Sequence, residues 1–441
     1  DSCLVGSEMC IRDSASCAGR TGPDRAPTRT RNSISHALRI LHVVTAFPRT
    51  PEDPITPWLV ELIRRQRAAG LDAQVLAPAY LGGPEREAFD DIPVHRFRYA
   101  PASWEVLTHD ETVPDRIRQR RYVAGLVPPY LAAGIRAGHE AGRSSPEVVH
   151  VHWPMPHALI GAAVRRGSGG RTAMVCSYYS VELNWVKGSM PRLMPFLRWT
   201  ARSADAVTAI STSTAGAVRQ LTDTPVYIVP YGAAFEDDGL PVRCSALRGE
   251  RPLRLLFVGR LVERKGVEVL VRALSALSAF PDAELTVIGT GERATIIERT
   301  ARVHGVADRV RMLGSVSRDR LVESYEDHDI FVLPAVVDEK GDTEGLGVVL
   351  LEALRFERPV IASGIGGITD IVEHGRSGLL VPPGDSDALA SAIDEMARDP
   401  ERARAMAATG REDVRRQFGW ERVVMETSRA YRVAMERRDG A

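Results

Sequence analysis

The sequence predicts an α/β protein built from two Rossmann-like, doubly wound domains with a cleft between them. Stretches typical of buried strands alternate with stretches of helical periodicity, the order that gives a parallel sheet with right-handed crossovers. The alternation stops near residues 232–252, which contain Gly, Pro and mixed charge without a period, and then starts again. With 441 residues, the chain is also too long for one ordinary core. Ligands of such sheets bind at the carboxyl ends of the strands, so we expect the site there.

The first domain is expected to begin with the buried strand LRILHVVT at residues 38–45. A Pro-rich loop, 47–57, precedes an amphipathic helix from Trp58 to Ala69, which Gly70 ends. The region 80–115 has aromatics and prolines without a period, and we interpret it as a functional loop. The other expected elements of this domain are strands at 73–77, 148–152, 173–176, 206–210 and 226–229, and helices at 159–165 and 194–203.

The second domain is expected to repeat the pattern after the segment 232–252. Its elements are strands at 253–258, 284–288, 310–313, 329–334, 359–363 and 378–381, and helices at 267–277, 294–304, 386–398 and 400–409. One more helix is expected to begin near Gly345 and Gly347 and to continue through Leu354. A last helix, 420–437, has apolar residues at helical spacing and is expected to pack on a domain surface. The predicted division of the chain is therefore 1–37, 38–240, 241–419 and 420–441.

The first residues are expected to lie outside the fold. Residues 1–14, DSCLVGSEMCIRDS, resemble the translated read-through of a sequencing adapter, and a polar tail continues to about residue 35. We therefore interpret 1–37 as a disordered, non-native leader. The chain has five cysteines with no C-x-x-C spacing, which argues against a disulfide framework or a zinc site.

The overall charge of the chain gives no sign of a nucleic-acid-binding protein. Lys plus Arg and Asp plus Glu both number 57, so no net field recruits a polyanion. No apolar run reaches the ~18 residues of a spanning helix, and the N-terminus lacks a signal-peptide pattern. We expect a cytoplasmic protein, with peripheral contact at the inner face of the membrane left open.

The stretch 342–352, DTEGLGVVLLE, predicts a loop that runs into a helix between two buried strands. Gly345 and Gly347 remove side chains where the helix begins, so a phosphate can approach free backbone N–H groups at the positive end of the helix dipole. Glu344 and Glu352 are eight residues apart, roughly 12 Å along a helix, too far for both to act on one bond. We expect the two carboxylates to contact different parts of one elongated ligand, a nucleotide that carries a further group. The alternative is that Glu344 is a solvated loop residue and that Glu352 only interacts favourably with the helix dipole from the first turns of the helix.

A second loop, Gly259-Arg260-Leu-Val-Glu-Arg-Lys265-Gly, follows a strand and precedes a helix. Arg260 and Lys265 there would neutralise a diphosphate, and Lys265 is one of only three lysines in the chain. The alternative is a polar loop. Gly289-Thr-Gly291 also follows a strand, but it lacks the third glycine of a dinucleotide fingerprint and indicates only a close backbone approach at Gly289.

Two further groups suggest a metal, and in both we favour an ordinary explanation. His150 and His152 share one face of their strand, with His157 nearby, but no carboxylate or thiol completes a set, so we interpret them as strand-end residues near the cleft. Asp327 and Asp329 have a D-x-D spacing but lie before a strand, where a helix-end cap and a strand-start turn are the simpler interpretation.

Taken together, these motifs resemble the retaining glycosyltransferases of family 4, group 1, whose two Rossmann-like domains form the GT-B fold. The resemblance covers about 38–437 and is carried by Gly259-Arg260 with Lys265-Gly266, by E-G-L-G-x4-E at 344–352, and by Gly366-Gly367-Ile368. The segment GDTEGL is similar to members that act in cell-surface polysaccharide assembly. The resemblance implies that 38–240 is the acceptor domain, that 241–419 binds the nucleotide sugar, and that the helix 420–441 crosses back onto the N-terminal domain.

The resemblance also implies roles for single residues. Arg260 and Lys265 would hold the donor diphosphate, Glu352 the ribose hydroxyls and Glu344 the transferred sugar. Backbone groups of Gly345, Leu346, Gly347 and Val348 would complete the donor site, with Gly289 close by. The family needs no metal and no other cofactor, because cationic side chains and a helix N-terminus take the leaving group's charge.

Two departures from the family concern the N-terminal domain. The loop 47–57 contains no glycine, although many relatives have glycines there. Where many members have His-Gly followed by an acidic residue, this chain has Tyr178 in place of the His and Glu182 at the acidic position. A tyrosine is a poor general base, with an unperturbed pKa of about 10. We expect Tyr178, Glu182 and His152 on the acceptor side.

The leading hypothesis is the retaining transfer of a hexose from a nucleotide diphosphate sugar to a glycan or lipid-linked acceptor in polysaccharide or glycoconjugate synthesis. The alternatives are a sugar phosphorylase, which needs a pyridoxal lysine, a nucleotide-sugar epimerase, and a non-catalytic nucleotide-sugar-binding protein. No nucleic-acid partner is expected. The sequence does not decide the nucleotide, the sugar, the acceptor or the oligomeric state.

Overall fold

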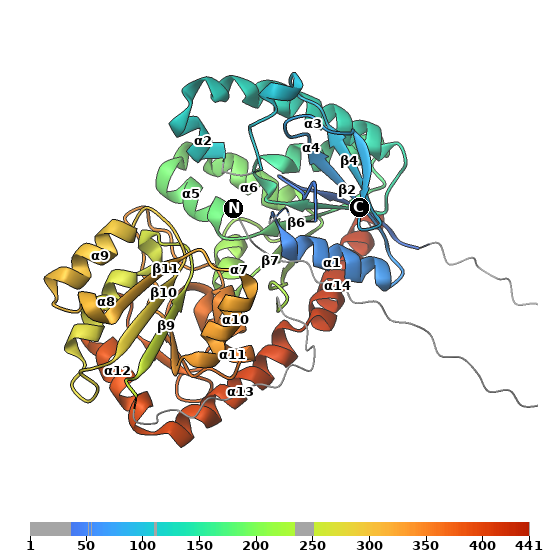
Figure 1. Ribbon diagram of the computed structural model, residues 1–441. Coiled ribbons are helices and arrows are strands. Elements are labelled where there is room, and N and C mark those ends of the chain that lie inside the picture. Colours follow the sequence, from blue (N-terminus) through green and yellow to red (C-terminus); the bar gives the residue numbers. More distant parts are fainter. Residues whose placement is uncertain (1–36, 52, 54, 110–112, 234–250, 441) are drawn as a thin grey trace, which may run out of the picture.

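A computed structural model describes residues 37–440 except 52, 54, 110–112 and 234–250. The expected leader 1–37 therefore lies almost wholly outside the described residues, as does most of the expected linker. The chain forms two α/β domains, each with its own parallel sheet, as predicted (Figure 1). Among the described residues, no helix has both the length and the apolar character that crossing a membrane requires.

The N-terminal sheet has eight strands in the order β3-β4-β2-β1-β5-β6-β7-β8. All neighbours are parallel except β3 and β4. The strands are β1 (Arg39–Val43), β2 (Asp72–Pro78), β3 (Arg86–Phe89), β4 (Ile92–Phe97), β5 (Val148–His152), β6 (Ala173–Tyr178), β7 (Ala206–Ala209) and β8 (Val226–Ile228).

The helices of this domain cover both faces of the sheet. One core lies under α3, α4 and α6, and the other lies under α1 and the last helix of the chain, α14. The helices are α1 (Pro57–Ala68), α2 (Val113–Gln119), α3 (Val127–Gly142), α4 (Pro154–Gly167), α5 (Val181–Ser189), α6 (Met194–Ser203) and α7 (Thr212–Arg219). Short 3-10 turns are η1 (Ala102–Trp104), η2 (Arg121–Leu126) and η3 (Pro191–Leu193).

The interpretation of 80–115 as an irregular loop was wrong in part. Residues 86–89 and 92–97 form an antiparallel hairpin at the sheet edge, joined through Asp90 and Asp91, which both have positive φ. β4 then pairs with β2 and presents buried and exposed residues alternately at its start. Polar residues in an edge hairpin weaken the apolar signal by which a strand is predicted, and this explains the error.

The C-terminal sheet is wholly parallel, in the order β11-β10-β9-β12-β13-β14. The strands are β9 (Arg254–Val258), β10 (Glu284–Ile288), β11 (Val310–Gly314), β12 (Ile330–Leu333), β13 (Val360–Ser363) and β14 (Leu379–Val381). The helices are α8 (Val267–Ala276), α9 (Ala294–Val303), α10 (Arg318–Asp327), α11 (Val348–Arg355), α12 (Ser386–Arg398), α13 (Pro400–Phe418) and α14 (Trp420–Asp439), with turns η4 (Glu263–Lys265), η5 (Ala307–Arg309) and η6 (Gly366–Asp370).

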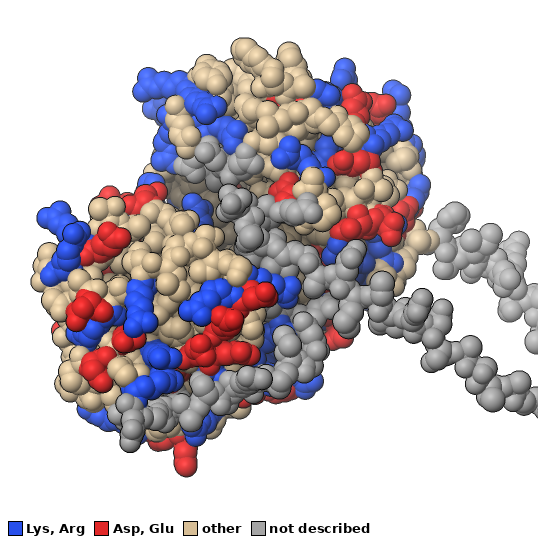
Figure 2. All heavy atoms as spheres, viewed as in Figure 1, with Lys and Arg blue, Asp and Glu red and all other residues tan. Residues whose placement is uncertain are grey.

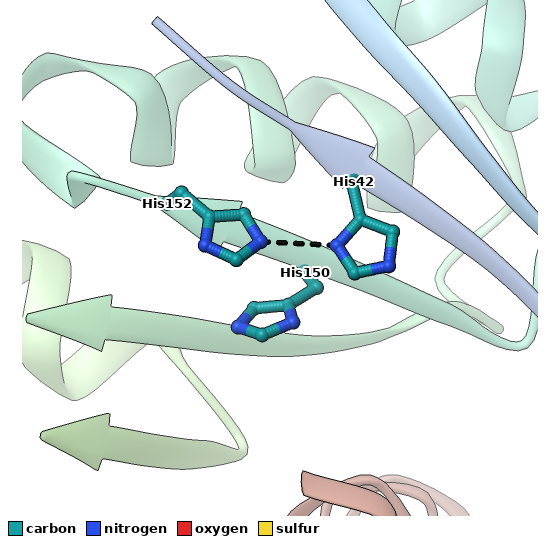
Figure 3. A group of neighbouring side chains, drawn as sticks. All are labelled: His42, His150 and His152. Carbon is teal, nitrogen blue, oxygen red and sulfur yellow. Dashed lines mark hydrogen bonds between the residues drawn. The ribbon is translucent and has the colours of Figure 1, made fainter. Parts of the chain in front are cut away.

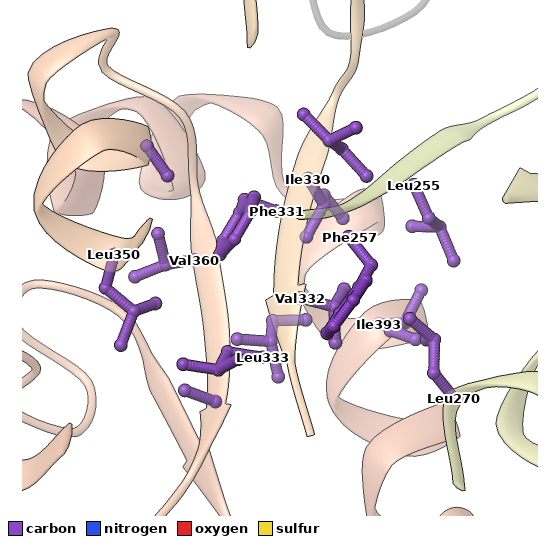
Figure 4. Close-up of a cluster of buried hydrophobic side chains, with 14 of the residues drawn as sticks. Leu255, Phe257, Leu270, Ile330, Phe331, Val332, Leu333, Leu350, Val360 and Ile393 are labelled. Carbon is purple, nitrogen blue, oxygen red and sulfur yellow. The ribbon is translucent and has the colours of Figure 1, made fainter. Parts of the chain in front are cut away.

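The central strands β9 and β12 carry an almost continuous apolar sequence because both of their faces are buried. Phe257, Ile330 and Phe331 are at most 1% exposed, and the helices above and below add Leu270, Leu350 and Ile393 to the same cluster (Figure 4). Such runs are typical of parallel strands covered by helices on both sides. This rigid sheet positions the loops at its carboxyl edge.

The last two helices join the domains. In Figure 1, α13 lies along the C-terminal domain and α14 continues onto the N-terminal domain. There α14 contacts α1 and strands β5 to β8, and its Trp420 and Tyr431 belong to the N-terminal core. The domains also touch directly, since the Asn184 amide donates to Asp342 at 2.7 Å and the Thr212 backbone N–H donates to Asp370.

Candidate active site

The loop before α11 is fixed by glycines that other residues cannot replace. Gly347, directly before α11, has φ +90°, in the left-handed region that favours glycine. Gly366 and Gly367 pack against the loop so closely that a Cβ on Gly366 would lie 2.1 Å from the Glu344 carbonyl oxygen. The Gly367 N–H donates to the same oxygen at 3.1 Å. The glycines of the two motifs thus hold Glu344 at the start of α11.

Glu344 lies in a cationic environment contributed by the loop after β9. Its carboxylate forms an ion pair with the ammonium group of Lys265, and Arg264 Nη1 lies 3.4 Å from the same oxygen, Oε2. Burial by itself would raise the pKa of Glu344, but Lys265 and Arg264 hold that pKa below its ordinary value. Glu344 is therefore ionised, and Lys265 neutralises it while both residues are only 8% exposed.

Glu352 lies one to two turns into α11 and has a different environment. Its Oε2 accepts a hydrogen bond from the Tyr325 hydroxyl of α10 at 2.8 Å. Burial raises the pKa of Glu352 to about 7, while Tyr325 and Lys265 act in the opposite direction. The two carboxylates predicted to have separate jobs thus differ in charge state near neutral pH.

Arg260 and Gly289 lie at the carboxyl ends of β9 and β10. Arg260 is exposed, and in the described part of the chain no carboxylate pairs with it. Gly289 has φ +134°, and a Cβ there would lie 1.9 Å from the Gly259 carbonyl oxygen. The close backbone approach predicted at Gly289 is therefore to the neighbouring loop of the protein.

The N-terminal domain reaches this site through the start of α5. A Cβ on Gly345 would lie 2.7 Å from Ser180 Oγ and 3.2 Å from Ile210 Cδ1. Glu182, in the first turn of α5, is 5% exposed, and its Oε1 accepts the Tyr179 N–H at 3.0 Å. Its Oε2 has no hydrogen-bond partner among the described residues, and burial raises the pKa of Glu182 to about 7.

The expectation that Tyr178 lies on the acceptor side was wrong. The Tyr178 side chain is fully buried in the core under α4 and α6, where its hydroxyl bonds Thr200 Oγ1 at 2.6 Å. Neighbouring residues of a strand point to opposite faces, so it is Tyr179 that faces the other way. Tyr179 joins the core of the C-terminal domain and contacts His152.

His152 belongs to a group of three histidines that sequence reasoning identified only in part. His42 on β1 joins His150 and His152 on β5, and one ring nitrogen of each lies within 4.8 Å of the others (Figure 3). The two strands are neighbours in register, with His42 opposite His150. Burial lowers the pKa of His42 to about 4 and the pKa values of His150 and His152 well below their ordinary value, so all three are neutral.

Hydrogen bonds satisfy all six ring nitrogens of this group. The Gln66 oxygen can only accept, so His42 Nε2 donates to it at 2.9 Å and His42 Nδ1 must be the acceptor nitrogen of that ring. His152 Nε2 donates to His42 Nδ1 at 3.0 Å, and the Tyr179 hydroxyl donates to His152 Nδ1 at 2.6 Å. On the other side, the Tyr431 hydroxyl accepts from Gln66 Nε2 at 3.0 Å and donates to His150 Nδ1 at 2.7 Å, and His150 Nε2 donates to Ser177 Oγ at 2.6 Å. This chain connects α14 to Tyr179.

The other candidate metal residues have structural partners. Asp329 is fully buried and forms a bidentate ion pair with Arg251, with both N···O distances 2.8 Å, and it also accepts the Arg254 N–H. Asp327 ends α10. His157 bonds the Tyr130 hydroxyl at 2.7 Å inside the N-terminal core. The ordinary interpretations of Asp327 and Asp329 therefore fit the structure. The interpretation of His157 as a strand-end residue near the cleft was wrong, because His157 lies on α4 and is buried.

An aromatic cluster that the sequence did not indicate lies at the carboxyl edge of the N-terminal sheet. Trp58, Trp153, Tyr179 and Tyr231 have neighbouring ring centroids 4.6 to 5.9 Å apart. The residues that precede α1, α4 and α5 all have positive φ without being glycine: Thr56 (+46°), Trp153 (+51°) and Ser180 (+71°). Each such residue costs on the order of 1–3 kcal/mol, and such strain clusters at functional sites.

Two family models match the chain, one in each domain. The model described as Glycosyltransferase Family 4 matches residues 58–236, and the model described as Glycosyl transferases group 1 matches residues 244–413. Among the similar proteins is a GDP-mannose-dependent α-(1-6)-phosphatidylinositol monomannoside mannosyltransferase of Mycobacterium tuberculosis, 30% identical over 396 residues, which are 87% of this chain and 95% of the relative. An N-acetyl-α-D-glucosaminyl L-malate synthase of Bacillus anthracis is 28% identical over 343 residues, 76% of this chain and 86% of the relative.

Solved structures support the same fold. Sucrose-phosphate synthase from Thermosynechococcus elongatus superposes with a TM-score of 0.68 at 21% identity, over 89% of this chain and 98% of that one. HepE from Anabaena, in complex with UDP and glucose, gives a TM-score of 0.65 at 18% identity, with the same two coverages. The predicted architecture and the predicted family are thus confirmed: the chain belongs to the family 4, group 1 glycosyltransferases and has their GT-B fold.

Proposed function

We propose that this glycosyltransferase moves a hexose, with retention of anomeric configuration, from a nucleotide diphosphate sugar to a glycan or lipid-linked acceptor. The observation that carries the proposal is the arrangement at the start of α11. There an ionised Glu344, Lys265 and a protonatable Glu352 lie around the N-terminus of α11, beside α5 of the other domain.

Each end of the donor has a suitable partner in this arrangement. The diphosphate would lie on Arg260, Lys265 and the backbone N–H groups of 345–348, because a helix N-terminus and cations stabilise phosphate charge. Glu344 would accept hydroxyl hydrogen bonds from the sugar, and Glu352 would bind the ribose. No metal and no other cofactor is part of the proposal, since these groups take the charge of the leaving diphosphate.

The acceptor would approach from the N-terminal domain. Glu182 offers a buried oxygen without a hydrogen-bond partner in the described part of the chain, and a hydroxyl of the acceptor or the donor sugar could donate to it. Tyr179, held by His152, lies beside it. A lipid-linked acceptor is supported by the mycobacterial relative, whose name specifies a phosphatidylinositol mannoside. It would place the enzyme in the cytoplasm at the inner face of the membrane, for synthesis of surface polysaccharide or glycoconjugate.

The direct test is a thermal-shift screen against UDP, GDP and ADP sugars, which needs no acceptor. A ligand at 100 times its Kd adds about 2.7 kcal/mol to the stability of the native state. One nucleotide series should raise Tm in the wild type and much less in Glu352→Ala, with the exposed Glu140→Ala as the matched control. If no nucleotide diphosphate sugar shifts Tm, the donor proposal fails.

The same screen leads to the reaction type. With the donor identified, NMR of the product formed on candidate acceptors reports the anomeric configuration, and inversion would contradict the proposal. Consumption of donor without an acceptor, giving an epimeric nucleotide sugar, would identify an epimerase. Binding without turnover on any acceptor tried would favour a binding protein.

A further inference from the structure

A buried tyrosine holds one of the two carboxylates of the candidate site. Tyr325 of α10 is fully buried, and its hydroxyl donates to Glu352 Oε2 at 2.8 Å. Burial is the main reason why the pKa of Tyr325 lies well above its ordinary value of 10.0, and the neighbouring Glu352 raises that pKa further. The hydroxyl therefore keeps its proton near neutral pH and remains a hydrogen-bond donor.

The core fixes Tyr325 in this orientation. Its ring stacks on Phe356, with the ring planes 6° apart and the centroids 5.3 Å apart, and its centroid lies 5.8 Å from that of Phe331. The buried Arg358 donates to the carbonyl oxygens of His328, just after α10, and of Phe356, just after α11, both at 3.0 Å. The helix that carries the tyrosine and the helix that carries the carboxylate are thereby tied together.

Glu352 keeps oxygen lone pairs for a ligand. A carboxylate has about four lone-pair positions, and the Tyr325 hydroxyl uses one of them. Among the described residues, no other group donates a hydrogen bond to Glu352, so its Oε1 is available. Two oxygens side by side match two vicinal hydroxyls, such as the 2′ and 3′ hydroxyls of a ribose. Because Tyr325 already orders the carboxylate, binding a ribose costs less side-chain entropy.

Charge does not distinguish a ribonucleotide from a 2′-deoxyribonucleotide. On the face of the C-terminal domain seen in Figure 2, Lys and Arg are interspersed with Asp and Glu. The two kinds of nucleoside diphosphate carry the same charge, so Arg260 and Lys265 would bind both alike. A difference in affinity between them has to come from a group that contacts the sugar of the nucleoside.

From these observations we infer that Tyr325 is a positioning residue through which the donor site selects ribonucleoside over 2′-deoxyribonucleoside diphosphate sugars. Tyr325 holds Glu352 so that it accepts from both ribose hydroxyls. A deoxyribose leaves one of these oxygens without its partner, and a site built to bind a hydroxyl rejects the analogue that lacks it. The inference rests on the proposed function, which places the ribose at Glu352.

The test is isothermal titration calorimetry of the full chain with UDP, GDP and ADP and with their 2′-deoxy counterparts, which needs neither acceptor nor turnover. For the nucleotide that binds best, the wild type should prefer the ribo form on the order of 10²-fold. Tyr325→Phe keeps the ring and should reduce this preference to about tenfold or less, because Glu352 must then be ordered by a ribose and can turn away from a deoxyribose.

Two comparisons separate positioning from an effect on folding. Glu352→Ala should abolish the preference, and adding Tyr325→Phe to it should change Kd by less than about twofold, because the tyrosine acts through the carboxylate. The matched control is Tyr130→Phe, which removes a buried hydroxyl that bonds His157 in the other domain and should keep the full preference. Melting curves check folding.

A second variant tests the same contact if Tyr325→Phe does not fold. Glu352→Asp retains the negative charge, but its shorter side chain withdraws the carboxylate from the Tyr325 hydroxyl. It should therefore also lose most of the preference for the ribo form. An unchanged preference in Glu352→Asp would contradict the inference.

Three further results would overturn the inference while leaving the proposed function in place. One is equal affinity of the wild type for the ribo and deoxy forms. Another is a full preference in Tyr325→Phe. The third is an equal effect of Tyr325→Phe with and without Glu352, which would mean that the tyrosine acts on the fold. If none of the nucleotides binds to the wild type, the proposed function fails together with this inference.

Discussion

Replacing Glu182 by Gln should stabilise the protein at alkaline pH and not at acid pH. Burial raises the pKa of Glu182 from 4.5 to about 7, and its Oε2 lacks a hydrogen-bond partner in the described part of the chain. A carboxyl group whose pKa is raised in the folded state contributes stability below its unfolded pKa and loses it as pH rises through the folded pKa. The native protein thus holds a proton that the unfolded chain releases between about pH 4.5 and 7.

The magnitude follows from the shift. At about 1.4 kcal/mol per pKa unit, a rise from 4.5 to about 7 makes the ionised Glu182 cost about 3 kcal/mol at pH 8. The amide introduced by Glu182→Gln cannot ionise and resembles the protonated acid. The difference in unfolding free energy, Glu182→Gln minus wild type, should therefore increase by about 3 kcal/mol between pH 4.5 and pH 8. For a domain of roughly 200 residues this is a Tm difference of roughly 6–12 °C.

The assay is thermal melting of both proteins at half-unit steps from pH 4.5 to 8, with the exposed Glu140→Gln as the control. Taking the difference cancels the other titrating groups, among them the buried histidines, whose lowered pKa values act in the opposite direction. A difference that is flat with pH would show that Glu182 is solvated, and the assignment of a buried acid beside the site would be wrong.

Three other changes test the rest of the structure. Glu344→Gln should lower kcat by roughly 10²-fold, because it removes a charge beside the sugar in the transition state, whereas Glu352→Ala should mainly raise the donor KM; steady-state kinetics that gave the reverse pattern would exchange the two roles. Tyr431→Phe should lower the free energy of unfolding, measured in urea, by about 2–3 kcal/mol, because Gln66 and His150 each lose a buried hydrogen-bond partner. The control, the exposed Tyr122→Phe, should leave it unchanged. Equal urea midpoints for Tyr431→Phe and wild type would mean that the buried hydrogen bonds do not stabilise the fold. Transfer should persist in excess chelator, and loss that manganese or magnesium restores would show that a metal takes part.

The sequence by itself determined the two-domain α/β architecture and the loop before α11. Strands that are buried on both faces appear in the sequence as continuous apolar runs. A backbone with positive φ or a very close backbone contact requires glycine at that position. Both features can therefore be recognised within a few residues of sequence. Gly347 and the Gly366-Gly367 pair are examples, and the structure gives each a geometric reason. The family resemblance depended on the same local motifs.

The edge hairpin, and which of Tyr178 and Tyr179 faces the domain interface, could be seen only in the folded sheet. A shift of one residue moves a strand side chain to the opposite face, and the sequence did not specify at which residue β6 ends. Tyr178 therefore went to the core and Tyr179 to the domain interface.

Only the tertiary structure decided which distant residues meet. Tyr431 bonds His150 across 281 positions and Gln66 across 365, and His42 reaches His152 across 110. Periodicity and spacing describe neighbours along one element, whereas these contacts depend on strand order and on where α14 docks. The pKa values of Glu182 and Glu352 have the same origin, because desolvation is set by the elements packed around a carboxylate, and a sequence window does not contain them.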